Sequence, residues 1–116
     1  MTKGKLIAKS GKVIIDPCAR TTNVFDRIRG LLLRPAPVAG AGLLIDPCAS
    51  IHTFGMSYPI DVVYLDAQYR VLRTIDAIDP WRLSVCRGAR MTLELAAGQA
   101  EALGFSPALE LQWLSD

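Results

Sequence analysis

Alternation of apolar and polar residues predicts most of the secondary structure of this chain, because successive side chains of a β-strand point to opposite faces. Residues 60–66 and 70–78 are rich in apolar and β-branched residues, and the turn-forming residues Asp66 to Tyr69 lie between them. This arrangement predicts a hairpin. Residues 89–95 alternate more strictly, with Met91, Leu93 and Leu95 on one face and Arg90, Thr92 and Glu94 on the other.

Shorter apolar segments predict further strands. Residues 5–15 read as two strands around the turn-forming pair Ser10-Gly11, and residues 43–45 as a short buried strand. Residues 81–86 and 109–114 each predict one more strand. No internal repeat is present.

Helical spacing occurs in two places. After a cap at Thr21 or Thr22, apolar residues recur with the period of a helix that runs to about Leu33: Val24, Phe25, Ile28, Leu31 and Leu32. Gly30 falls inside this pattern, where glycine costs about 1 kcal/mol relative to alanine. Residues 97–104 predict a short helix that ends at Gly104. The Pro- and Gly-rich residues 35–42 predict a loop.

These elements predict a strand-dominated α+β fold with six to eight strands. We expect an antiparallel β-sandwich or open barrel with one N-terminal helix and one short C-terminal helix. The 116 residues, 51% hydrophobic and 21% charged, are typical of a single folded domain over residues 1–116.

Charge is unevenly distributed along the chain. The first 34 residues hold eight Lys or Arg and two Asp, whereas the remainder holds five basic and nine acidic residues. Without a run of adjacent basic residues or interleaved aromatic residues, this pattern is typical of a solvated face and does not favour a nucleic acid partner.

The three cysteines form no Cys-x-x-Cys pair, and the N-terminal residues include no apolar run typical of a secretory signal. No apolar stretch approaches the length of a membrane span. We therefore expect a cytoplasmic protein with free thiols.

Residues 46–61 concentrate the side chains with chemical potential. The only histidine of the chain, His52, lies there with Cys48, Met56 and two aspartates, Asp46 and Asp61. Such a set could bind a soft metal, activate a nucleophile or line a binding cleft.

Six short motifs follow one another in a characteristic order. They span Arg29–Arg34, Gly42–Cys48, Ile51–Met56, Pro59–Asp66, Pro80–Arg82 and Leu93–Gly98. Over roughly residues 20–114 the chain resembles the domain of unknown function 192 family. The resemblance implies a compact, mostly β domain of bacteria and archaea, often preceded by a signal peptide, with no settled activity. Leu32 stands where members commonly have methionine, and Pro107-Ala108-Leu109 where a glycine-aspartate turn is usual.

The favoured interpretation is a binding cleft between the 46–61 loop and the 80–82 turn. Its predicted lining combines ring-bearing and polar side chains suited to a small polar or anionic ligand or to a protein partner: His52, Thr53, Tyr58, Asp61, Trp81 and Arg82. Arg29 and Glu94 are expected on the surface, outside this set.

Two alternatives use other chemistry. Cys48, His52 and Met56, with Cys86 as a possible fourth ligand, are donors suited to copper or zinc, although no cofactor is expected from their spacing. In a thiol-dependent enzyme, Cys48 would be the nucleophile and His52 its base, and Asp61 or Asp46 would orient the imidazole. The sequence assigns no reaction and no oligomeric state.

Overall fold

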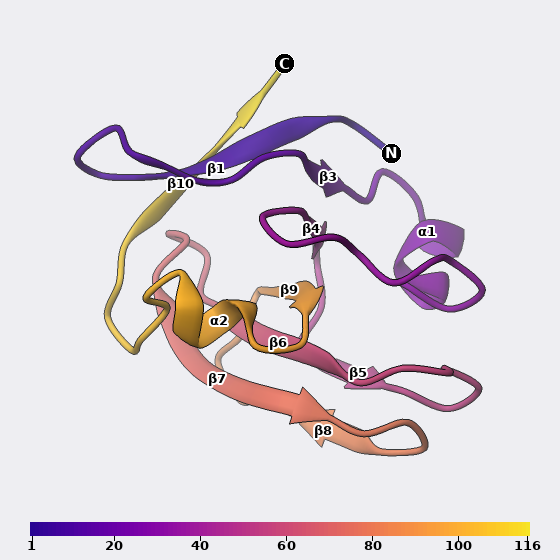
Figure 1. Cartoon of the computed structure of the whole chain (residues 1–116). Helices are drawn as coiled ribbons and strands as arrows, with labels where there is room; N and C mark the ends of the chain where they lie inside the picture. Colours follow the sequence, from indigo (N-terminus) through magenta and orange to yellow (C-terminus); the bar gives the residue numbers. More distant parts are fainter.

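Ten strands and two short helices make up the chain, and the computed structural model describes all of its residues, 1–116 (Figure 1). In chain order they are β1 (Gly4–Ala8), β2 (Val13–Ile15), β3 (Cys18–Arg20), α1 (Val24–Arg29), β4 (Gly42–Ile45), β5 (Ser50–His52), β6 (Ile60–Leu65), β7 (Val71–Ile78), β8 (Leu83–Val85), β9 (Met91–Ala96), α2 (Gln99–Ala102) and β10 (Leu111–Ser115).

A five-stranded sheet in the order β3-β4-β9-β6-β7 forms the middle of the molecule. The predicted hairpin is confirmed as β6 and β7, which pair antiparallel. β9 lies between β4 and β6 and pairs antiparallel with both. The expected all-antiparallel arrangement is wrong in one place, because β3 pairs with β4 in parallel.

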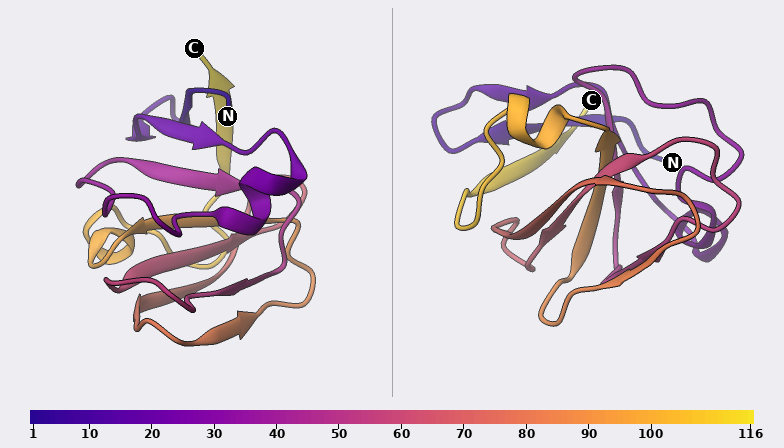
Figure 2. Two further views of the ribbon diagram at one scale, coloured as in Figure 1. Left: turned by 90° about the vertical axis from the view of Figure 1, so that its right-hand side faces the viewer. Right: turned by 60° about the horizontal axis from the view of Figure 1, so that its bottom comes forward.

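Both faces of this sheet are covered. A three-stranded sheet in the order β10-β1-β2 packs on one face, where Leu6 and Leu111 join Leu44, Val63 and Leu93 in one core cluster. The ribbon of β5 and β8 covers the other face, where a second cluster is built. β1 and β10 lie at the top of Figure 1 and β8 at the bottom, and two further views of these layers are given in Figure 2.

The expectation that Glu94 points to solvent is wrong, because the second cluster buries its side chain. Glu94 pairs across the sheet with Leu43 on β4 and Val62 on β6, and both of these side chains belong to that cluster. Only 3% of Glu94 is exposed. The alternation in residues 89–95 is real, but each face of β9 meets a covering layer.

Helix α1 is shorter than the expected helix from Thr21 or Thr22 to about Leu33. Asn23 caps it by accepting a hydrogen bond from the Asp26 amide at 2.8 Å. Gly30 ends it in a positive-φ conformation (51°) that other residues rarely adopt. A Cβ at this position would lie 2.9 Å from Oε1 of Glu94, so glycine also permits a close approach.

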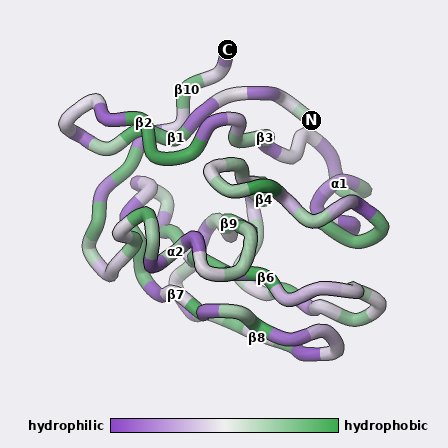
Figure 3. The backbone as a smooth tube through the Cα atoms, viewed as in Figure 1, coloured by the Kyte–Doolittle hydropathy of each residue, from purple (hydrophilic) through white to green (hydrophobic).

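No residue of α1 is buried, and Phe25 and Ile28 are 71% and 70% exposed. Along α1 and the chain after it, hydrophilic and hydrophobic segments follow one another (Figure 3). Leu31, which the helical period also included, lies beyond the helix and enters the second core cluster.

The fold class is confirmed at the level of a strand-dominated domain with two short helices. The three sheets stack without closing into a barrel. The predicted helix at residues 97–104 is present as α2, four residues long. No helix has the length and apolar character needed to cross a membrane.

Candidate functional site

A cavity of about 320 Å³ lies between the chain that follows α1 and the chain that leads into β5. Residues 27–32 form one wall and residues 47–52 the other, with Ile45 and Met56 between them. Glu94 of β9 also lines this space, and we call it the Glu94 cavity. Its size is at the lower end of the range for small-molecule sites.

Glu94 carries the most unusual polar group of the molecule. Its Oε1 is the one buried side-chain oxygen or nitrogen without a hydrogen-bond partner, and such groups are rare in folded proteins. Burial raises the pKa of the Glu94 carboxyl to about 7, and the nearby Leu31 backbone amide opposes this rise only in part. The carboxyl is therefore poised to change its charge near neutral pH.

No arginine neutralises this carboxyl. Arg29 lines the cavity, but its Nε donates to the Leu32 carbonyl at 3.0 Å and its Nη2 to the Leu33 carbonyl at 3.4 Å. The guanidinium thus satisfies the chain that follows its own helix. Arg29 and Glu94 therefore form no ion pair.

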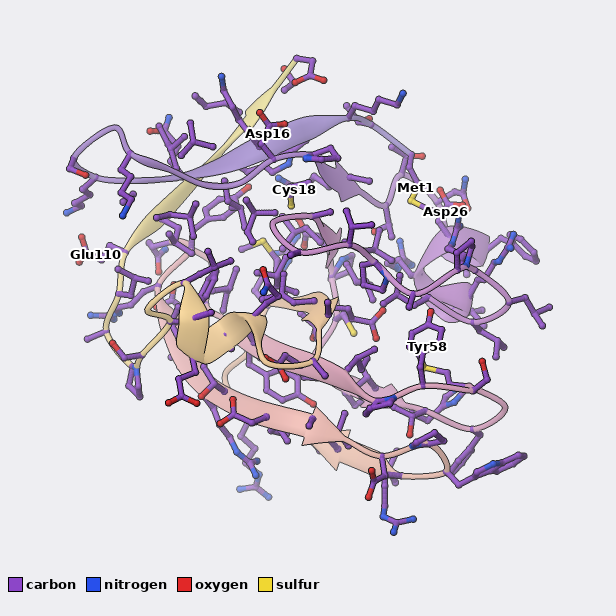
Figure 4. The ribbon with its side chains drawn as sticks, viewed as in Figure 1. Met1, Asp16, Cys18, Asp26, Tyr58 and Glu110 are labelled. Carbon is purple, nitrogen blue, oxygen red and sulfur yellow. The ribbon has the colours of Figure 1, made fainter.

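Tyr58 fixes the wall that follows α1. Its hydroxyl lies 3.0 Å from the Arg34 carbonyl and 3.2 Å from the Leu31 carbonyl, and it can donate to either. Figure 4 shows Tyr58 rising from the β5–β6 loop toward this segment. Arg34 adds a second restraint, because its Nε donates to the Gly30 carbonyl at 2.9 Å.

Tyr58→Phe is expected to lower the free energy of unfolding by about 1–2 kcal/mol, because it removes a donor from partly buried carbonyls. Urea denaturation measures the change. Ser57→Ala, at an exposed neighbouring position, serves as the control and should be close to neutral. An unchanged midpoint for Tyr58→Phe would contradict this role.

The three soft donors of residues 46–61 all line the Glu94 cavity. Cys48 Sγ donates to the Ser50 carbonyl at 3.0 Å, and His52 Nδ1 accepts from the Phe54 amide at 3.3 Å. Met56 is nearly buried. The structure holds no group of three or more His, Cys, Asp or Glu side chains arranged as metal ligands, and metal binding through Cys48, His52 and Met56 stays a prediction.

Thr53 is fully buried, which corrects its expected place in the cleft lining. Its Oγ1 donates to the Asp79 carbonyl at 2.6 Å and accepts from the Arg82 amide at 2.9 Å. Backbone bonds from Thr53 to Arg82 and from Trp81 to Thr53 reinforce the junction. The 46–61 loop and the 80–82 turn therefore meet, as expected, and Thr53 joins them.

The 80–82 turn, expected as the second wall of the cleft, lies outside the Glu94 cavity. Trp81 and Arg82 do not line the Glu94 cavity, and residues 27–32 take their place. Trp81 is 65% exposed and stacks on Phe54, whose ring stacks in turn on His52. The three rings form an exposed row, of which only His52 lines the Glu94 cavity.

Asp61 is also fully buried, which corrects its expected roles as a cleft residue and as the partner of His52. Its Oδ1 accepts from the Ala77 amide and its Oδ2 from the Ala100 amide, each at 2.8 Å. Asp46, the other carboxylate considered, forms ion pairs with Arg20 and Arg90. Neither aspartate orients the imidazole, so the proposed Cys48–His52–Asp61 arrangement is not assembled.

Sequence reasoning missed Glu94 and the wall of residues 27–32. A usable signal was present, because Leu43–Ile45 and Ile60–Leu65 are almost continuously apolar, which is typical of strands buried on both faces. An acidic residue on a strand that pairs with two such strands is buried by the layers that cover them.

The three thiols are expected to react with iodoacetamide in the order Cys48, Cys86, Cys18. Cys48 is only partly buried, whereas burial raises the pKa of the Cys18 thiol to about 12, and the thiolate is the reactive form. Peptide mass spectrometry over a time course at pH 8 gives the order. Equal rates at all three positions would contradict it.

Comparisons with known proteins agree with this fold. Residues 8–113 match the sequence model of the DUF192 family, described as Uncharacterized ACR. A UPF0127 protein of Thermococcus sibiricus is 35% identical over 118 residues, which cover 97% of this chain and 71% of the relative.

Two solved structures are similar to the chain. One is a protein of unknown function from Novosphingobium aromaticivorans (TM-score 0.76, 22% identity, covering 96% of this chain and 84% of that one). The other, from Sinorhizobium meliloti 1021, is provisionally described as a transcription regulator (TM-score 0.76, 21% identity, covering 97% and 92%). At these identities the likeness shows the fold alone.

Proposed function

The chain belongs to the DUF192 family of uncharacterised proteins, and we propose, from the chemistry of its own site, that it binds a small polar ligand in the Glu94 cavity. The observation that carries the proposal is the buried, unpartnered Oε1 of Glu94 at a cavity that opens to the surface. A ligand that donates a hydrogen bond there would satisfy an acceptor that the protein leaves without one.

The surroundings of Glu94 support a small ligand with an apolar body. Leu31, Ile51 and Met56 line the cavity and belong to the second core cluster. Ser50 and His52 from β5 add polar groups at exposed positions. The cavity thus offers both apolar contacts and polar groups to a ligand.

The anionic ligand considered from the sequence is less well supported. An anionic group beside the Glu94 carboxylate would meet like-charge repulsion in a poorly solvated place. Any acidic group of the ligand would have to lie toward Arg27, a partly exposed cavity residue.

Nuclear magnetic resonance with ¹⁵N-labelled protein and a chemically diverse set of small polar fragments tests the proposal. At least one fragment is expected to shift the amide signals of Leu31, Ser50 and Ile51 in a saturable way. Ser50→Trp, placed at the cavity, should abolish these shifts, whereas Ser57→Trp, an exposed residue outside the cavity, should preserve them. Absence of a saturable shift for every fragment would refute the proposal.

The compartment proposed for this function is the reducing cytoplasm. Cys18, Cys48 and Cys86 are all free, and free thiols are typical of proteins that work under reducing conditions. Fractionation of the native host with antibodies against the protein would locate it, and recovery outside the cytoplasm would refute this assignment.

A further inference from the structure

We infer that the Glu94 cavity selects a ligand with a primary amine on a short aliphatic body, so that an ammonium group donates to Oε1 of Glu94. This inference rests on the proposed function and names its ligand class.

No residue of the elements that pack around Glu94 forms an ion pair with its carboxylate. On its own sheet, the cross-strand neighbours are Leu43 and Val62, which carry no charge. In the wall after α1, the Arg29 guanidinium donates hydrogen bonds to the carbonyls of Leu32 and Leu33. A buried carboxylate without a cation is strongly unfavourable. The carboxyl can avoid this penalty by holding a proton or, when ionised, by pairing with a cation that a ligand brings.

The other titratable groups near the cavity form no ion pair with Glu94. Cys48 and His52 line it from the opposite wall and already bond to Ser50 and to the Phe54 amide. The Tyr58 hydroxyl donates to backbone carbonyls, and its pKa is raised by burial and then by the charge of Glu94. Arg27 is the only other cation at the cavity.

The shape of the cavity limits the rest of the ligand. About 320 Å³ admits a molecule of amino-acid size. Leu31, Ile51 and Met56 offer apolar contacts to an aliphatic chain, and such contacts favour carbon atoms over further polar groups. Because Glu94 must be ionised to pair with an ammonium group, binding should strengthen from about pH 5.5 to about pH 8.

Matched probes test the class of ligand. Isobutylamine and isobutanol have the same carbon skeleton and differ in the group that would reach Glu94. In NMR titrations at pH 8, the amine is expected to bind at least tenfold more tightly than the alcohol, a difference of about 1.4 kcal/mol. Glu94→Gln should weaken the amine at least tenfold and leave the alcohol unchanged, and Glu101→Gln, at an exposed position of α2, should change neither.

The outcomes separate this inference from the proposed function. Equal affinity of the two probes, or amine binding that Glu94→Gln does not weaken, would overturn the amine class while leaving a ligand cavity in place. Failure of both probes to bind would also overturn it, and the fragment experiment would then decide the proposed function by itself. A Glu94 carboxyl that titrates below about pH 5 in ¹³C spectra would show that the protein itself stabilises the carboxylate, which overturns the inference as well.

Discussion

Replacing Asp61 with alanine is expected to lower the free energy of unfolding by about 3–5 kcal/mol, since hydrogen bonds to a charged group contribute about 1.5–3 kcal/mol each. The Asp61 carboxylate accepts from two amides in different elements, Ala77 near the end of β7 and Ala100 in the first turn of α2. Truncation leaves both donors unpaired, and the Ala100 amide is buried. Urea denaturation measures the loss.

Asp76→Ala is the matched control, because Asp76 is an exposed aspartate on β7. It should change the free energy of unfolding by no more than about 0.5 kcal/mol. A loss below about 1 kcal/mol for Asp61→Ala would show that neither amide depends on the carboxylate.

Glu94→Gln is expected to remove a pH dependence of stability. The carboxyl has a pKa of about 7 in the folded protein against an ordinary value of 4.5. Between these values the folded state holds a proton that the unfolded state has lost, so stability falls as pH rises. Each unit of pKa difference corresponds to about 1.4 kcal/mol, so the contribution of Glu94 is on the order of 3 kcal/mol.

This contribution is fully present below about pH 4.5 and is lost as pH rises through about 7. The stability of Glu94→Gln relative to the unmodified chain should therefore increase by about 3 kcal/mol between about pH 4.5 and about pH 8. Denaturation curves of both proteins at a series of pH values measure this difference, in which other titrating groups cancel. Glu101→Gln provides the surface control. A difference that does not vary with pH would contradict the raised pKa.

The local pattern of apolar and turn-forming residues was sufficient to predict the elements that are formed by hydrogen bonds between residues close together in the sequence. The β6–β7 hairpin follows from a turn at Asp66, whose Oδ1 accepts from the Gln68 and Arg70 amides, a turn chemistry visible in the residues themselves. The end of α1 was misplaced because the apolar period continues through Leu31 and Leu32. Gly30 stops the helix there, and it lies within contact distance of Glu94, 64 positions later in the chain.

The site was harder to predict because its residues come from distant segments. Cys48, His52 and Met56 lie beside one cavity because one short loop holds them. Thr53 and Asp61 were misassigned because the same polar atoms suit a ligand and a buried backbone amide equally well. Only the placement of β7, the turn between β7 and β8, and α2 shows that backbone groups already occupy them.

The two sides of the Glu94 cavity differ in how firmly they are held, because β9 lies in the centre of its sheet. Glu94 is carried by a strand hydrogen-bonded on both edges, so its amides are expected to exchange hydrogen slowly, whereas residues 24–29 bury no side chain and should exchange quickly. The Glu94 carboxyl thus lies on the rigid side of the cavity, opposite a helix that is held less firmly. Such a site can require a ligand group that pairs with Glu94 and still accept ligands of different length. Its selectivity for charge is then separable from its selectivity for size.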